Sequence, residues 1–228
     1  MLNLKSPLAS SLAFAGLLLA GTAGAATTNG FANGGFETAG SGGAWVADGW
    51  LTAPTGNPVL WSGEAHTGSH SALLTVPAGF GASTLLQDST GHGGLPALDA
   101  SNVGDTPVLS FWAKGDVSTT GNIGFALRYL GANGILVDSQ FQFFQNQINA
   151  SSWTQISFQA AAIPAGALSV FLEMNTAVGP LLDGRVNAVY VDDVQLTLTT
   201  AAVPEPQTYA LLLAGLGLVA TIARRRRA

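Results

Sequence analysis

The central part of the chain consists of short apolar or alternating runs. Clusters of Gly, Pro, Asn and Asp, which favour turns, separate these runs. The runs are rich in β-branched and aromatic residues, and none has a sustained helical period. We predict strands at residues 71–76, 83–87, 108–113, 123–130, 135–144, 153–160, 168–175 and 188–198. Many short strands between turns are typical of a β-sandwich or jelly roll, so we expect an all-β fold.

One pair of these strands has the signature of a hairpin. Strands 123–130 and 135–144 are joined by Gly131-Ala132-Asn133-Gly134. An Asn-Gly pair tolerates the positive φ angles that a tight turn needs. The two strands are therefore expected to be antiparallel neighbours.

Alternation within a strand predicts which side chains face the core, because successive side chains point to opposite faces. One face of strand 168–175 is predicted to carry Leu168, Val170, Leu172 and Met174. One face of strand 188–198 is predicted to carry Ala188, Tyr190, Asp192, Val194, Leu196 and Leu198. That second face is apolar except for Asp192, so Asp192 should point toward the core and Asp193 outward.

A buried Asp192 would need a cation or hydrogen-bond donors. Basic side chains are almost absent from this part of the chain. A calcium ion, which prefers oxygen ligands, is therefore one expected partner. Backbone N–H groups at the edge of the sheet are the alternative.

The N-terminus follows a different pattern. Lys5 precedes an apolar run at residues 8–20, and the small residues Ala23, Gly24 and Ala25 follow it. This is the layout of a secretory signal peptide at residues 1–25, with cleavage expected after Ala25. A first transmembrane helix is the alternative, but the apolar run is short for one.

The C-terminus holds a second apolar run, at residues 209–223, which carries no charge. It is followed at once by Arg224, Arg225, Arg226 and Arg227. Clustered arginines beside an apolar helix favour a cytoplasmic end. We therefore predict a transmembrane helix over 209–223, with the central domain outside the inner membrane. A buried helix of that domain would leave the arginines unexplained.

Pro204-Glu205-Pro206 stands directly before this predicted helix. The two prolines prevent helix and favour extended backbone, which suits the cleft of a processing enzyme. In its three parts and their order, the segment 201–228 resembles the PEP-CTERM sorting signal of Gram-negative bacteria. The resemblance implies cleavage by an exosortase, transient anchoring in the inner membrane, and an organism that makes exopolysaccharide. The released protein would reach the cell envelope, the cell surface or the extracellular matrix.

Removing both ends leaves one domain, residues 26–200, and changes its charge. Three basic residues, Lys114, Arg128 and Arg185, stand against twelve acidic ones, a formal net charge of −9. Such a domain repels phosphates, so we expect no nucleic-acid partner. The sequence has no Cys, which excludes thiol nucleophiles and thiolate zinc sites. An exported domain without disulfides depends on its core or on a metal.

Several motifs across residues 31–198 occur in a characteristic order. They are Asn33-Gly34-Gly35-Phe36-Glu37, Gly49-Trp50, residues 66–73, residues 109–114, residues 153–158 and residues 189–194. In this set the chain resembles carbohydrate-binding-module-like jelly rolls of the galactose-binding-like group. The resemblance implies a jelly-roll β-sandwich, between a signal helix and a hydrophobic C-terminal helix. It also implies a structural calcium at Glu37 and Asp192, with backbone oxygens of residues 64–71.

Sugar-binding members of this group stack aromatic rings on sugar faces. Trp61, in a stretch rich in Pro and Gly, is the expected platform. A second wall is expected on the predicted hairpin, from Tyr129, Phe141, Phe143 and Phe144. Arg128 and the glutamines Gln140, Gln142 and Gln145 are the expected hydrogen-bond partners. The alternative is that these aromatic residues belong to the core. Core positions are expected for Trp45, Trp50, Trp112 and Trp153, which lie in motifs that usually serve the core.

Catalytic signatures are weak in this sequence. His66 and His70 lie on a Gly- and Ser-rich turn, where solvated histidines are more common than zinc ligands. There is no nucleophile elbow and no recognisable pair of facing glycosidase carboxylates. The sequence therefore predicts a non-catalytic exported protein that binds or scaffolds extracellular polysaccharide, in the envelope or a biofilm matrix. A purely structural matrix protein is the alternative, and an enzyme acting on polysaccharide is less well supported.

Overall fold

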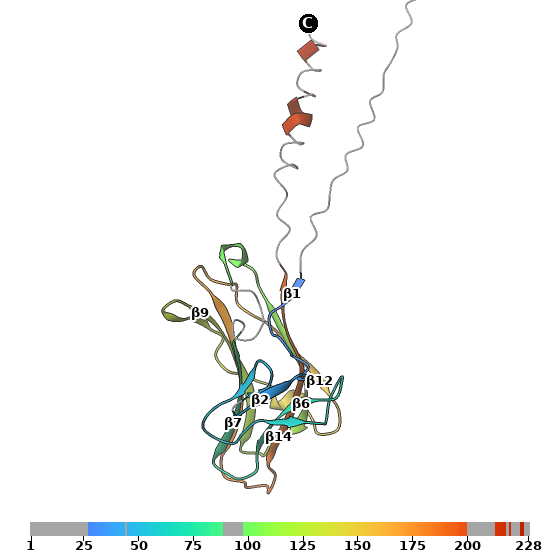
Figure 1. The fold of residues 1–228 in the computed structure, drawn as a ribbon, viewed down its shortest axis with the longest axis vertical. Coiled ribbons are helices and arrows are strands. Elements are labelled where there is room, and N and C mark those ends of the chain that lie inside the picture. The colour runs from blue at the N-terminus through green and yellow to red at the C-terminus, as the bar shows by residue number, and fades with distance from the viewer. Residues whose placement is uncertain are drawn as a thin grey trace, which may run out of the picture. The chain divides into compact units, whose positions relative to one another are not determined.

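The computed structural model describes residues 27–43, 45–88, 98–199, 213–217, 219 and 224–225 (Figure 1). Several predicted features lie outside these residues. They are the signal peptide with its cleavage site at Ala25, the segment Pro204-Glu205-Pro206, and the last two arginines, Arg226 and Arg227. A compact unit spans Ala25–Ala201, apart from the two ends of the chain.

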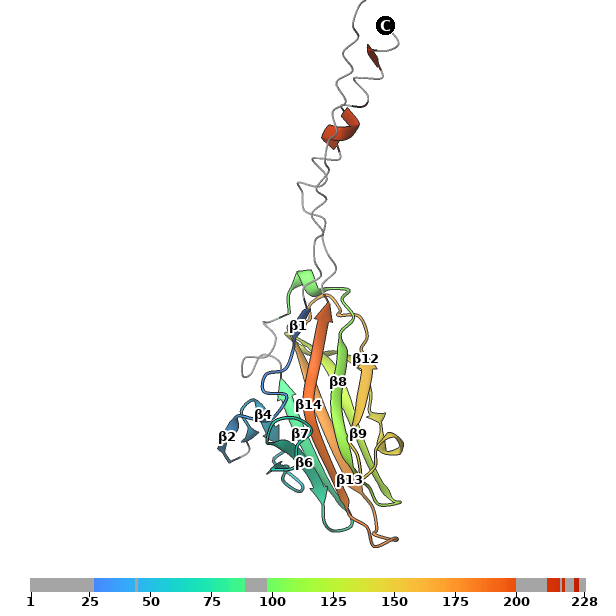
Figure 2. The same ribbon diagram turned by 90° about the vertical axis from the view of Figure 1, so that its right-hand side faces the viewer.

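The domain consists of two antiparallel sheets. One sheet has the order β12-β8-β14-β6-β5, with β1 paired to β14. Its strands are β1 (Thr27–Asn29), β5 (Leu60–Ser62), β6 (Ser71–Val76), β8 (Val108–Asp116), β12 (Thr154–Gln159) and β14 (Asn187–Thr199). We call it the six-stranded sheet, and Figure 2 views the domain from the side of β14 and β8.

The eight-stranded sheet has the order β10-β9-β13-β7-β4-β3-β2, with β11 paired to β9. Its strands are β2 (Ala39–Gly42), β3 (Trp45–Ala47), β4 (Trp50–Thr52), β7 (Gly81–Asp88), β9 (Gly121–Gly131), β10 (Gly134–Asp138), β11 (Gln142–Phe143) and β13 (Ser169–Val178). Two single-turn 3₁₀ helices complete the domain, η1 (Ala100–Asn102) and η2 (Gln145–Gln147). The arrangement is the predicted jelly-roll β-sandwich.

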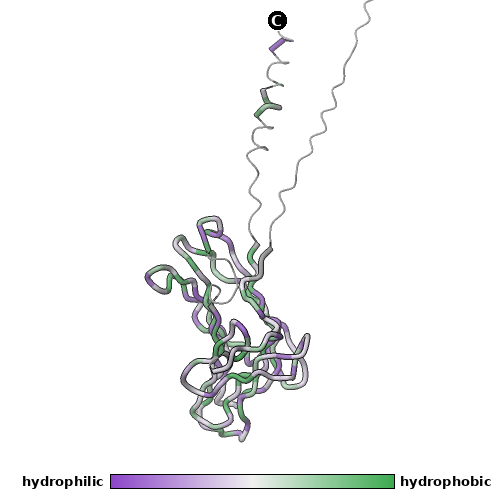
Figure 3. The backbone as a smooth tube through the Cα atoms, viewed as in Figure 1, coloured by the Kyte–Doolittle hydropathy of each residue, from purple (hydrophilic) through white to green (hydrophobic). Residues whose placement is uncertain are grey.

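The facing sides of the two sheets form the core. Phe111 of β8 meets Phe125 of β9 edge to face, with ring centroids 5.6 Å apart, and so joins the two layers. Trp50 of β4 is fully buried against Phe36. Hydrophobic and hydrophilic residues are interleaved along the domain (Figure 3), as expected when one face of each strand is buried.

The predicted hairpin is present, but its second strand is broken. Gly131 of β9 pairs with Gly134 of β10, and Gly134 has a φ of 114°. The pairing shifts between Ile135 and Val137, and β10 ends at Asp138. Gln140 has a φ of 57°, and the chain then pairs with β9 again as β11. A bulge and a left-handed residue therefore divide the predicted strand 135–144.

The predicted core face of β13 is right except at its first residue. Val170, Leu172 and Met174 are fully buried. Leu168 is 48% exposed, because β13 begins only at Ser169. The residue precedes the strand and does not share its alternation.

The predicted face of β14 is wrong in its first half. In the first half of the strand, the core residues are Val189 and Val191. In the second half they are Val194, Leu196 and Leu198, as predicted. The pairing with β8 shifts between Asp192 and Gln195, and Asp193 has a φ of 50°. A bulge adds a residue and exchanges the two faces of a strand. Ala188, Tyr190 and Asp192 therefore lie on the outer face. Asp192 is buried there by the loop between β5 and β6, and not by the core as predicted.

At the C-terminus, residues 213–217, 219 and 224–225 are helical. They include part of the predicted helix 209–223, and the rest of it is outside the described residues. Within the described residues, no helix is both long enough and apolar enough to cross a membrane.

Candidate functional site

The outer face of the eight-stranded sheet carries Arg128. Leu127 and Tyr129 of β9 are buried in the core, so Arg128 between them points away from it. Arg128 lies opposite Asp138 of β10 and Phe171 of β13. Strand pairing thus places Arg128 between Asp138 and Phe171, whose side chains share its face of the sheet.

Two carboxylates hold Arg128 in place. Its Nε donates to Oδ2 of Asp138 at 2.9 Å, and its NH1 nitrogen donates to Oε2 of Glu173 at 2.7 Å. The hydrogen bond from Arg128 lowers the pKa of Asp138, which stays ionised at neutral pH. The remaining N–H groups of this planar side chain can donate to a ligand.

Apolar and neutral polar side chains continue this face toward β7 and β4. Phe171, Leu86 and Leu51 are half-buried on its outer side. Asn175 of β13 donates from Nδ2 to Oγ1 of Thr84 at 2.6 Å. The face therefore combines half-buried apolar side chains with hydrogen-bonding groups that are held in place.

An aromatic pair lies at the side of this face, over β9. The rings of Phe141 and Phe143 have centroids 6.2 Å apart and planes 24° apart, and Phe143 is 56% exposed. Both rings pack close to Gly124 of β9, where an added Cβ would lie 2.9 Å from the Phe143 ring. Arg128, Phe141 and Phe143, all predicted from the sequence, thus lie around one strand.

Tyr129 lies on the opposite side of that strand. It is 2% exposed, and its hydroxyl donates to the carbonyl oxygen of Ala161 at 2.6 Å. Burial raises the pKa of the phenol, which stays neutral. Because neighbouring residues of a strand face opposite ways, Tyr129 does not join Arg128 on the outer surface, and that part of the prediction is corrected.

Trp61 lies on β5, in the other sheet. Its ring is 40% exposed and stacks on His70, with centroids 3.8 Å apart. Its Nε1 donates to the carbonyl oxygen of Phe36 at 2.7 Å. Trp61 is partly exposed, as expected, but it belongs to a different surface from Arg128. Its role as a platform for a sugar ring stays a prediction.

The predicted metal ligands both bind the loop between β5 and β6. Asp192 is fully buried, and its Oδ2 accepts the N–H groups of His66 at 2.7 Å and Thr67 at 3.2 Å. Burial raises the pKa of Asp192 to about 6. Oε1 of Glu37 accepts the N–H groups of Ser69 and His70, each at 2.9 Å.

The sequence left two possible partners for a buried Asp192, a calcium ion or backbone N–H groups. The hydrogen bonds from His66 and Thr67 are of the second kind. An oxygen that faces N–H hydrogens has fewer lone pairs for a cation, so the arrangement favours this alternative over calcium. In the part of the chain that the structure describes, no three His, Asp or Glu side chains form a group that could hold a metal ion.

Calcium binding at Glu37 and Asp192 stays a prediction, and chelation tests it. A cation bound only by the folded state would stabilise it, so EGTA should lower the melting temperature and added calcium should restore it. Asp192→Asn should remove that response. A melting temperature that does not depend on EGTA would leave the N–H groups as the partners of both carboxylates.

The sequence reasoning missed an aromatic cluster on the outer face of the six-stranded sheet. The ring of His66 stacks on Trp112 with centroids 3.9 Å apart, and its Nδ1 lies 2.7 Å from Oδ2 of Asp193. Trp153 meets the same imidazole edge-on. Trp112 was expected in the core. Alternation with the buried Phe111 and Ala113 was the signal that would have placed it outside.

The comparison with protein families identifies the C-terminus. The PEP-CTERM protein-sorting motif matches residues 202–227. A search of curated proteins finds no match to the sequence.

Solved structures resemble the domain in fold. The enzymatically active domain of tailspike protein 4 from bacteriophage CBA120 aligns with a TM-score of 0.53 and 18% identity, over 75% of this chain. The chain spans only 21% of that tailspike chain. The Stig cyclase Fisc from Fischerella sp. TAU aligns with a TM-score of 0.50 and 16% identity, over 78% of this chain and 99% of its own.

A carbohydrate-binding module is also among the similar structures. The CBM22-1 xylan-binding domain of Paenibacillus barcinonensis Xyn10C aligns with a TM-score of 0.45 and 15% identity, over 78% of this chain and 95% of its own. At these identities the similarities concern the fold alone. The chain is therefore a jelly-roll β-sandwich protein that carries a PEP-CTERM protein-sorting motif.

Proposed function

We propose that the domain is a non-catalytic module that binds extracellular polysaccharide and helps to organise it in the cell envelope or matrix. The observation that carries this proposal is the outer face of the eight-stranded sheet. There, Arg128 is fixed by two carboxylates beside the half-buried Phe171, and the pair Phe141 and Phe143 adjoins the same strand.

This combination suits the chemistry of sugars. A sugar ring offers an apolar face of C–H groups and a rim of hydroxyls. Aromatic rings provide the flat apolar contact, and a fixed guanidinium and carboxylates provide donors and acceptors in set directions. Groups held in place before binding lose little conformational entropy when the ligand arrives, which favours affinity.

The sorting motif supports the place of action. A PEP-CTERM motif marks an exported protein with a processing signal. We infer that the chain is held in the inner membrane by its C-terminus until an exosortase cleaves near Pro204-Glu205-Pro206. The domain then acts in the envelope, at the cell surface or in the matrix.

Phe143→Ala tests the binding face. The side chain is 56% exposed, so its removal should leave the fold intact and remove stacking area. We expect binding to soluble polysaccharide to weaken about tenfold, or about 1.4 kcal/mol. Affinity gel electrophoresis of the full chain measures this, with neutral polysaccharides and the exopolysaccharide of the host in the gel.

Phe80→Ala is the matched control. Phe80 is 83% exposed and lies in the turn between β6 and β7, outside the strands that carry the proposed face. The Phe80→Ala variant should be retarded by the polysaccharide in the gel as strongly as the parent protein. Retardation lost in Trp61→Ala but kept in Phe143→Ala would move the site to β5. No retardation by any polysaccharide would support the structural matrix protein instead.

A further inference from the structure

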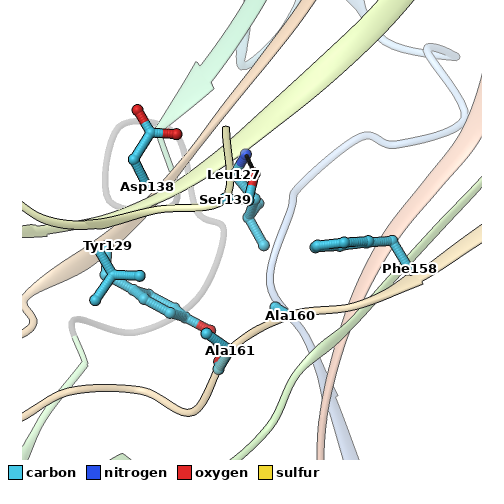
Figure 4. Close-up of a pocket in the computed structure, with 8 residues that line it drawn as sticks. Leu127, Tyr129, Asp138, Ser139, Phe158, Ala160 and Ala161 are labelled. Atoms are coloured by element: carbon cyan, nitrogen blue, oxygen red, sulfur yellow. Dashed lines mark hydrogen bonds between the residues drawn. The ribbon is translucent and has the colours of Figure 1, made fainter. Parts of the chain in front are cut away.

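A pocket of about 240 Å³ opens between the edges of the two sheets. β9 and β10 contribute Leu127, Tyr129 and Val137, and the other wall comes from Phe158 of β12 and Ala160 just beyond it. Figure 4 shows the rings of Tyr129 and Phe158 pointing into the same space. The pocket lies on the inner side of β9, opposite the outer face that carries Arg128, and Asp138 of β10 belongs to both.

The pocket exists because strands end at this position. β12 ends at Gln159, and β10 ends at Asp138 after its bulge. The residues that follow β12 are Ala160 and Ala161, whose methyl groups are too small to fill the space between the sheets. Such a space either takes up water or accepts an apolar group.

The polar groups of the lining are already hydrogen-bonded. The hydroxyl of Tyr129 donates to the carbonyl oxygen of Ala161 at 2.6 Å. Oγ of Ser139 accepts the N–H of Leu127 at 2.9 Å and donates to the carbonyl oxygen of Gln140 at 2.8 Å. A ligand therefore meets mainly apolar surface and finds few polar groups that need a partner.

Charge at the pocket further restricts the ligand. Asp138 belongs to the lining, but its carboxylate points away from the two rings (Figure 4) and is paired with Arg128. None of the described lining residues is basic, so none of these side chains balances the charge of an anion, and fatty acids and aromatic acids are disfavoured. The net negative charge of the whole domain acts in the same direction.

We propose that this pocket binds a neutral, single-ring aromatic molecule, or such a ring as a substituent of a larger one. Two aromatic side chains offer edge and face contacts to an incoming ring. The size is suitable, since an engineered apolar cavity of about 150 Å³ binds benzene. Larger ligands need pockets of about 300 Å³ or more.

Benzyl alcohol and benzoate test the proposal as a matched pair, because they share the ring and differ in charge. The full chain is titrated with each while methyl NMR signals are recorded. Benzyl alcohol should shift the signals of Leu127, Val137 and Ala160 to saturation, and benzoate should not. Shifts that are absent, or that spread over the domain without saturating, would overturn the proposal.

Filling the pocket gives a second test. Ala160→Leu should weaken the affinity for benzyl alcohol about tenfold to hundredfold, because each added methylene occupies the space of the ligand. Ala165→Leu, at an exposed position of the same loop, should bind as the parent does. Val137→Leu also makes the pocket smaller, and Val137 is only half-buried, so the fold should tolerate the change. This variant replaces Ala160→Leu in the test if Ala160→Leu fails to fold. Unchanged affinity in the folded filling variant would place the ligand elsewhere.

Discussion

Replacing Trp50 with alanine is expected to lower the free energy of unfolding by about 3–5 kcal/mol. The indole is fully buried, with centroids 4.9 Å from Phe36 and 6.0 Å from Phe31. Its Nε1 donates to the carbonyl oxygens of Ala32 at 3.2 Å and Asn33 at 2.9 Å. The change removes both hydrogen bonds and leaves a cavity where the N-terminal segment packs on β4.

Urea denaturation measures this loss, and Trp50→Phe separates its two parts. Phenylalanine keeps most of the packing but cannot donate to the carbonyls, so a loss of about 1–2 kcal/mol is expected. If Trp50→Ala cost no more than Trp50→Phe, the packing around Phe31 and Phe36 would not be the source of the stability.

Asn187→Asp should destabilise the fold by about 3–5 kcal/mol at neutral pH, because it places an unpaired charge in the interior. Asn187 is fully buried at the start of β14. Its Nδ2 donates to Oγ1 of Thr176 at 2.8 Å and to the carbonyl oxygen of Ala177 at 2.9 Å, and its Oδ1 accepts the N–H of Ser118 at 2.9 Å. The amide thus joins the two sheets.

The effect of Asn187→Asp should depend on pH. Burial raises the pKa of the new carboxyl in the folded state, so the loss of stability is full above that folded pKa. It should decrease as pH falls through the folded pKa, because a protonated carboxyl can donate one hydrogen bond. Asn187→Ala carries no charge and should lose stability without this dependence. Equal pH profiles for the two variants would contradict the buried charge.

The longer strands could be predicted because they alternate and are bounded by turn residues. β6 and β9 are examples, and the Asn-Gly turn indicated the hairpin of β9 and β10. Strands β2 to β5 have only three or four residues each, too few for alternation to be recognised. Their pairing depends on distant residues such as Leu86 of β7, which pairs with Leu51.

The faces of the candidate site were harder to predict. The bulge at Asp193 exchanges the two faces of β14, and the alternation of apolar and polar residues along the strand does not reveal it. Tyr129 and Arg128 were grouped as neighbours in sequence, although alternation separates them. The carboxylates that hold Arg128 come from β10 and β13. Such long-range partners become visible only when the register of the sheet is known.

The position of β14 has a mechanical consequence. β14 pairs with β8 on one side and with β6 and β1 on the other, and it leads directly to the C-terminal end of the domain. In a chain held by that end, a pulling force enters along the axis of β14. The hydrogen bonds to its neighbours lie across that axis, so they resist in shear and break together rather than one after another. A domain that binds a polymer before its C-terminal anchor is cleaved would thus carry the load on β14.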